Sequence, residues 1–232
     1  MNARDLMRLH VQALYTMDAR GRLDRVNEPG GGPAPRFFLG RTREGNEWWF
    51  RHDVDDAVAH ELEALAASET VSDDLRTSRV SAARYEALLA RVGPVQRTES
   101  GPAYWVPPSE SSASPDVVHV TGENVDLLHR YLTPWLGDVV TSPPLFALLH
   151  DGHGVAVCAS VRITPLAHEA GVETHLDFRG RGYAPHVVAA WAEAVRALGA
   201  VPLYSTSWQN TASQAVARKL GLVRFGGDLH FT

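Results

Sequence analysis

The 232-residue sequence contains a single cysteine and no long hydrophobic run. Cys158 has no second thiol to pair with, and its apolar neighbours at residues 155–161 favour a buried structural thiol over a nucleophile. No stretch approaches the ~18 apolar residues of a membrane-spanning helix, and the first residues lack the apolar core of a signal peptide. We therefore expect a cytoplasmic protein with no membrane partner.

Positive charge is also scarce. The formal net charge is -5 at pH 7, and Lys219 is the only lysine. Binding to the phosphates of nucleic acid requires a basic face, so we expect no nucleic-acid partner. The 44% hydrophobic and 21% charged residues are typical of a folded globular protein, and the length allows one large or two small domains.

The most informative stretch is residues 171–191. Residues 171–175 favour a strand, residues 179–182 (Arg-Gly-Arg-Gly) a tight turn, and a helix begins at about Tyr183, with Pro185 in its first turn. The first amides of a helix have no helical acceptor and lie at the positive end of its dipole. The glycines allow close approach of a phosphate, and the arginines attract it. These residues predict a diphosphate site.

Two common phosphate motifs do not fit this stretch. The dinucleotide pattern G-x-G-x-x-G requires glycine where Pro185 stands, and a P-loop requires Gly-Lys-Ser/Thr, which is absent. Residues 179–184 (Arg-Gly-Arg-Gly-Tyr-Ala) instead resemble the Q/R-x-x-G-x-G/A signature of the GNAT (GCN5-related N-acetyltransferase) family. Residues 202–227 resemble the family's fifth strand, an Asn-capped helix after Asn210, and a Lys-Leu-Gly turn ending at Gly221. The resemblance covers roughly residues 115–232.

The fold class predicted is α/β (α+β), with a GNAT-type mixed, mostly antiparallel sheet flanked by helices. Strands at 117–120, 145–150 and 155–161, with helices at 124–132 and 133–142, agree with this topology. The polar, proline-bounded residues 107–115 predict a linker between an N-terminal α+β domain, 1–108, and a GNAT domain, 115–232. The N-terminal half is either a degenerate GNAT-like domain or an unrelated α+β cap. Its predicted elements are a helix at 6–17, a hairpin at 36–52, helices at 56–67 and 81–92, and a strand at 102–107.

The resemblance implies transfer of an acetyl group from acetyl-CoA to an amine, by direct attack in a ternary complex without a metal. It implies that the turn binds the pyrophosphate and that the preceding strand offers an edge to the pantetheine arm. The implied cofactor-binding residues are Val172, Glu173, Thr174, Arg179, Gly180, Arg181, Gly182, Tyr183, Ala184, Asn210 and Ser213.

The acid that protonates the leaving thiolate does not carry over from the family. Many members have a tyrosine where this chain has Ala217. The substitutes offered by location alone are Tyr204, Ser205 and Ser207 on the fifth strand, and Tyr204 is equally compatible with a place in the core.

Candidate bases lie on the strand before the turn. Glu169 and Glu173 are two strand periods apart and therefore share a face. A partly buried carboxylate has a raised pKa, which suits removal of an ammonium proton through water. His168 and His175 are weaker candidates, and surface ion pairing of the two glutamates is the alternative.

The sequence leaves the acceptor open. A small-molecule amine and a protein or peptide amine are both compatible with the sequence as acceptor. No feature of the sequence predicts the oligomeric state. Because Ala217 replaces the tyrosine that many family members have, a second function is also compatible with the sequence: a catalytically silent acyl-CoA-binding regulatory module. An acyl donor longer than acetyl is a third alternative.

Overall fold

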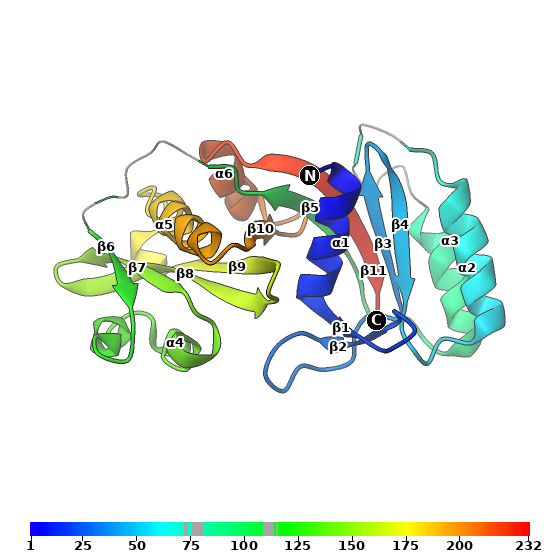
Figure 1. Ribbon diagram of the computed structural model, residues 1–232, viewed down its shortest axis with the longest axis horizontal. Coiled ribbons are helices and arrows are strands. Elements are labelled where there is room, and N and C mark those ends of the chain that lie inside the picture. The colour runs from blue at the N-terminus through cyan, green and yellow to red at the C-terminus, as the bar shows by residue number, and fades with distance from the viewer. Residues whose placement is uncertain (72–73, 76–80, 109–113, 115) are drawn as a thin grey trace. The chain divides into compact units, whose positions relative to one another are not determined.

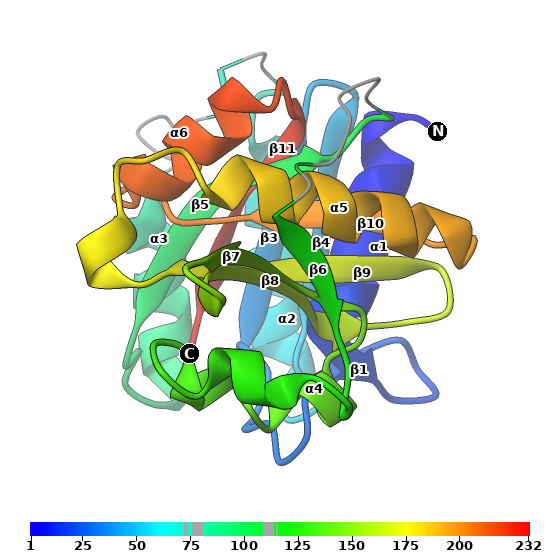
Figure 2. The same ribbon diagram turned by 90° about the vertical axis from the view of Figure 1, so that its left-hand side faces the viewer.

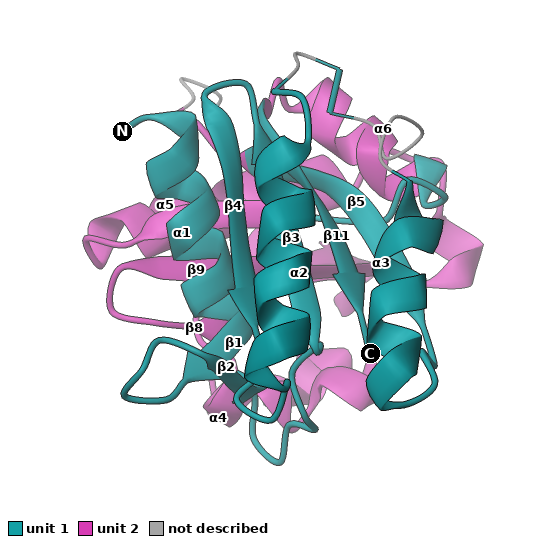
Figure 3. Cartoon of the chain, turned by 90° about the vertical axis from the view of Figure 1, so that its right-hand side faces the viewer, with its two compact units in different colours: residues 1–104, 205–211, 224–232 teal, residues 105–204, 212–223 magenta. Residues whose placement is uncertain are grey.

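The computed structural model describes residues 1–71, 74–75, 81–108, 114 and 116–232. The chain forms two compact units (Figure 3). Unit 1 contains residues 1–104, 205–211 and 224–232, and unit 2 contains residues 105–204 and 212–223. The architecture is mixed α+β with mostly antiparallel strands flanked by helices, which confirms the predicted class. The domain division at 1–108 and 115–232 stays a prediction, and most of its linker lies outside the described residues.

The sheet of unit 1 joins the two ends of the chain. Its strand order is β4 (Gly45–Phe50), β3 (Phe37–Thr42), β11 (Val223–Phe231) and β5 (Thr98–Trp105). Strands β3 and β4 form the predicted hairpin, whereas β11 pairs antiparallel with β3, with Phe231 opposite Phe37. The last strand of the chain therefore completes a sheet that begins in the N-terminal half. Strands β1 (Tyr15–Met17) and β2 (Leu23–Val26) form a separate ribbon.

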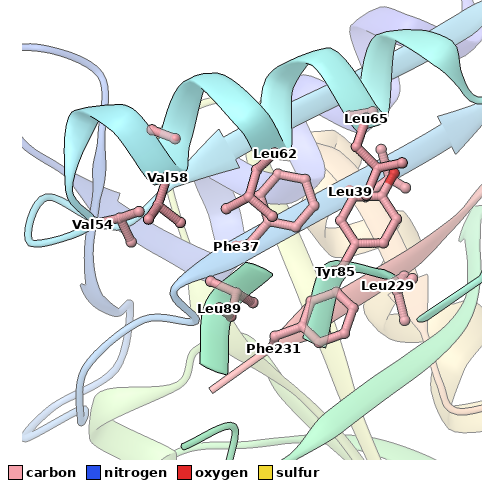
Figure 4. Packing of buried hydrophobic residues seen from close by; sticks show 12 residues of the cluster. Phe37, Leu39, Val54, Val58, Leu62, Leu65, Tyr85, Leu89, Leu229 and Phe231 are labelled. Atoms are coloured by element: carbon pink, nitrogen blue, oxygen red, sulfur yellow. The ribbon is translucent and has the colours of Figure 1, made fainter. Parts of the chain in front are cut away.

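Helices cover both faces of this sheet. Helix α1 (Ala3–Leu14) packs where Gly40 and Gly226 leave room, because a Cβ at these positions would lie 2.5 Å and 2.4 Å from atoms of the Met7 side chain. Helices α2 (Asp56–Ser68) and α3 (Ala82–Leu89), the latter continued by η2 (Ala90–Val92), pack on the opposite face (Figure 4). The apolar core there includes Phe37, Leu39, Val58, Leu62, Tyr85, Leu89, Leu229 and Phe231.

Four titratable side chains form a connected series within unit 1, which we call the acid–imidazole chain. Glu99 Oε2 lies 3.3 Å from His230 Nε2, His230 Nδ1 lies 3.5 Å from Asp228 Oδ1, and Asp228 Oδ2 lies 3.4 Å from His10 Nε2. Burial acts to lower the pKa of His230, but the Asp228 and Glu99 carboxylates outweigh it and raise this pKa to about 9. Burial acts to raise the pKa of Asp228, but its contacts with the His10 and His230 imidazoles lower it to about 2.

Unit 2 is built on five strands in the order β10 (Val201–Ser205), β9 (Ala167–Thr174), β8 (His153–Ile163), β7 (Leu145–His150) and β6 (Val117–Val120). Only the β9–β10 pair is parallel. Helix α5 (Ala184–Ala197) lies across one face (Figures 1 and 2). The short helices η3 (Val125–Leu128), η4 (Thr133–Trp135) and α4 (Asp138–Thr141) cover the other, and α6 (Thr211–Lys219) follows β10.

Two predicted helices differ from the observed ones. The helix predicted at 6–17 ends at Leu14, because Tyr15 and Met17 pair with β2 instead. The helix predicted at 124–132 is a single 3-10 turn, η3. Asn124 does not cap it, since the Asn124 side chain accepts a hydrogen bond from the Thr121 amide and donates one to the His119 carbonyl.

Candidate functional site

The predicted strand, turn and helix are present as β9, residues 179–183 and α5, with the 3-10 turn η5 (Leu176–Phe178) after the strand. Gly180 and Gly182 have φ values of +78° and +81°, which a residue with a Cβ adopts only at a cost. No side chain caps α5. The amides of residues 180–184 have no acceptor among the residues that the structure describes. The start of α5 therefore presents a run of free donors at the positive end of the helix dipole.

Three cations surround this turn. Arg179 Nε donates to the Thr174 carbonyl at 3.0 Å, and an Arg181 Nη donates to the Asp177 carbonyl at 3.2 Å. These bonds anchor the guanidiniums without neutralising them, because neither forms an ion pair within the described part of the chain. The third cation is Lys219 in the last turn of α6, whose Nζ lies 2.6 Å from the position that a Cβ on Gly182 would occupy.

The turn fits a diphosphate. The turn carries free amides and two arginines, the Lys219 ammonium approaches it, and the space beside Gly182 exists only because that residue lacks a side chain. Sequence reasoning did not assign Lys219 to this site. The contact joins α6 to a turn separated from it by α5 and β10, so local sequence patterns could not predict it. The only feature of the sequence that distinguished Lys219 is that it is the only lysine.

The edge of β9 is open beyond the middle of the strand. Strand β10 pairs with it only from Val201↔Ala167 to Leu203↔Glu169, whereas β9 continues to Thr174. Residues 172–174 pair with β8 on one side and have no partner strand on the other among the described residues. An open strand edge next to a diphosphate turn is where an extended polar chain can add its own hydrogen bonds.

The two candidate carboxylates lie on the face of β9 that η3 and η4 cover. Glu169 is only 2% exposed, and Glu173 is half-buried. Glu173 Oε2 accepts a hydrogen bond of 2.6 Å from Trp135 Nε1. Gly171 lies between them on the same face, where its missing side chain leaves room for the Trp135 ring. Nothing in the sequence pointed to Trp135, because the contact joins η4 to a strand 38 residues later.

His168 lies on the opposite face of β9, under α5. Its Nδ1 lies 2.8 Å from Ser160 Oγ, which accepts a hydrogen bond of 2.9 Å from Trp191 Nε1. Burial lowers the pKa of His168. The other histidine candidate, His175, lies on the carboxylate face with its ring 4.9 Å from that of Tyr131. The structure thus separates His168 from the glutamates and leaves His175 on their side.

The residues predicted on the fifth strand and the following helix fall into both units. Tyr204 is buried, and its hydroxyl lies 2.6 Å from Ser213 Oγ on α6, within unit 2. Ser205 and Asn210 belong to unit 1, where the Asn210 amide donates to Ser207 Oγ at 3.2 Å. The roles of these residues stay predictions.

The remaining reactive side chain, the thiol of Cys158, has a structural role, and the described residues form neither a metal site nor a membrane-spanning helix. Cys158 is fully buried, as predicted, and burial raises the pKa of its thiol. Among the described residues, no three His, Cys, Asp or Glu side chains gather so as to hold a metal ion. Within the same residues, no helix has the length and apolar character needed to cross a membrane. The compartment stays a prediction.

Residues 146–225 match the family model of the GNAT acetyltransferases. The C-terminal half of the chain thus carries a segment of this family, as its two motifs predicted, and the matched residues run from β7 to β11. No curated protein matches the chain.

Solved structures with a similar backbone include three from the same family. A GNAT-family protein from Novosphingobium aromaticivorans is 21% identical over 59% of this chain and 65% of its own, with a TM-score of 0.49. The alignment thus spans slightly under two thirds of that protein. An acetyltransferase from Colwellia psychrerythraea is 16% identical over 80% of this chain and 76% of its own, with a TM-score of 0.49. An acetyltransferase from Kribbella flavida is 15% identical over 100% of this chain and 95% of its own, with a TM-score of 0.47.

Proposed function

We propose that the protein is an acyltransferase that moves an acetyl group from acetyl-CoA to an amine by direct attack in a ternary complex. The observation that carries this proposal is the turn at the start of α5. Its free amides and left-handed glycines, flanked by Arg179, Arg181 and Lys219, suit the diphosphate of coenzyme A. The matched family segment supports acyl transfer as the class of reaction.

Each part of the site has a separate task. Acetyl-CoA supplies an acyl thioester when bound. The turn holds the diphosphate, and the open edge of residues 172–174 forms strand-like hydrogen bonds with the arm that follows it. Glu173 takes a proton from the acceptor ammonium, directly or through one water. The amine nitrogen then bonds to the acyl carbon, the carbon–sulfur bond breaks, and the nitrogen releases a second proton to solvent as the amide forms. The thiolate takes up a proton, for which Tyr204 and Ser205 remain the candidate donors, and solvent reprotonates the donor.

Binding of the cofactor is tested by calorimetry. We expect acetyl-CoA to bind the wild-type protein and Arg179→Glu/Arg181→Glu to bind it at least about 10-fold more weakly, because each reversal removes a charge-assisted contact. Arg20→Glu/Arg84→Glu changes the net charge equally at two exposed positions of unit 1 and should bind normally. No heat from the wild-type protein, or equal binding by both double variants, would refute the proposal.

Turnover is tested by thiol release from acetyl-CoA in the presence of small-molecule amines and peptides. Steady release that depends on the amine supports an enzyme. Tight binding without turnover across the panel would favour the silent acyl-CoA-binding module, which no structural observation singles out. Replacing acetyl-CoA by longer acyl donors in the same assay determines the chain length accepted.

A further inference from the structure

The hydrogen bond between Trp135 and Glu173 joins the 3-10 turn η4 to strand β9, on the face of the sheet that η4 covers. Trp135 ends the 3-10 turn η4, and Glu173 is the penultimate residue of β9, opposite Val157 of β8. The donor–acceptor distance of 2.6 Å is short for an N–H···O bond, as expected when the acceptor is a carboxylate. The bond therefore restrains the Glu173 side chain to one orientation.

The indole itself is held in place at its other end. A Cβ on Gly171 would lie 3.1 Å from Trp135 Cη2 and 2.2 Å from Val161 Cγ1. The Trp135 ring thus packs directly over the backbone of β9, two residues before Glu173. Trp135 also packs against the apolar cluster of this face, which contains Val157. A fixed ring with its N–H aimed at the carboxylate is a preorganised support rather than a chance surface contact.

Among the described residues, only one of the two carboxylate oxygens of Glu173 accepts a hydrogen bond. Oε2 accepts from the indole, while Oε1 has no donor among the residues that the structure describes. Glu173 also lies beyond the last β9–β10 pair, at the stretch where the other edge of β9 is open. The carboxylate is consequently oriented and half-buried, and its Oε1 is able to accept a proton or hydrogen bond from a ligand.

We propose that Trp135 is a positioning residue for Glu173, holding Oε2 so that Oε1 receives the proton of the acceptor ammonium. This inference rests on the proposed acyltransferase function. The proton passes from nitrogen to Oε1, and Trp135 keeps its own N–H throughout. Because an oriented base lowers the barrier to proton transfer without contacting acetyl-CoA, the loss of Trp135 should affect turnover and not cofactor binding.

Three variants test the role by kinetics. We expect Glu173→Gln to lower kcat by roughly 100-fold or more, since general bases contribute about 10²–10⁴. Trp135→Phe, which keeps an aromatic side chain, although a smaller one, and removes the N–H, should lower kcat by roughly 10-fold, with the Kd for acetyl-CoA unchanged. The double variant should be no slower than Glu173→Gln alone, because the indole acts through the carboxylate. Trp49→Phe, a half-buried tryptophan of unit 1, is the matched control and should turn over normally.

A readout without cofactor tests the bond itself. The indole N–H resonance of Trp135, assigned by its absence from Trp135→Phe, should move in the NMR spectrum of Glu173→Gln. An unmoved resonance, or multiplicative losses in the double variant, would overturn the positioning role and leave the acyltransferase proposal standing. Absence of turnover by the wild-type protein would overturn both.

Discussion

The acid–imidazole chain of unit 1 predicts that the protein loses stability as the pH rises above neutrality. His230 has a pKa near 9 in the folded protein and 6.5 as its ordinary value. The folded state thus binds an extra proton between these values, and its stabilising effect is complete below pH 6.5 and lost as the pH rises through 9. The slope approaches about 1.4 kcal/mol per pH unit midway between the two pKa values and is smaller near each of them, so we expect the free energy of unfolding to fall by about 2 kcal/mol between pH 6.5 and roughly 8.5.

Three other groups with a shifted pKa affect stability outside this window. The pKa of His168 is lowered by burial, so its effect has the opposite sign and is confined to pH values below 6.5. Burial raises the pKa values of Cys158 and Tyr85, whose contributions are lost only above their ordinary values of 9.0 and 10.0. None of these three groups accounts for a decline across the window, whereas the raised pKa of His230 beside its two carboxylate partners does.

Urea unfolding followed by tryptophan fluorescence at closely spaced pH values measures this decline. His230→Gln should be less stable near neutrality but should show no slope over the window, because the titrating imidazole is gone. His52→Gln, which removes a half-exposed imidazole 3.5 Å from Asp24, should keep the wild-type slope. A wild-type stability that is constant or rises from pH 6.5 to 8.5, or an unchanged slope in His230→Gln, would refute the reasoning.

Three further predictions concern unit 2. Gly180→Ala and Gly182→Ala should each lower the free energy of unfolding by about 1 kcal/mol, because both residues have a left-handed backbone. Only Gly182→Ala displaces the Lys219 ammonium, so it should weaken acetyl-CoA binding more than Gly180→Ala does, and equal Kd values for the two variants would contradict this. Lys219→Met should raise the Kd for acetyl-CoA by roughly 5- to 10-fold at low salt and less at high salt, and an unchanged Kd in calorimetry would exclude contact with the diphosphate. Tyr204→Phe should lower the free energy of unfolding by about 1 kcal/mol, because it removes the hydrogen bond between the Tyr204 and Ser213 hydroxyls; unfolding at the wild-type urea midpoint would show that the bond is not formed.

The sequence by itself determined the local features of the candidate site. A left-handed turn requires glycine, a helix start tolerates Pro185, and the orphan amides of that start follow from helix geometry alone. The strand, turn and helix around residues 179–182 were therefore predictable without any distant contact. The β3–β4 hairpin and the burial of Cys158 were predictable for the same reason, since alternation and apolar runs are local signals.

Only the tertiary structure decided which distant residues meet. The approach of Lys219 to Gly182, the bond from Trp135 to Glu173, and the assignment of His168 to the face opposite the glutamates depend on how elements pack. The placement of β11 beside β3 has the same origin. Such contacts depend on shape complementarity between segments far apart in the chain, whereas residue type and spacing report on a few turns of backbone at most.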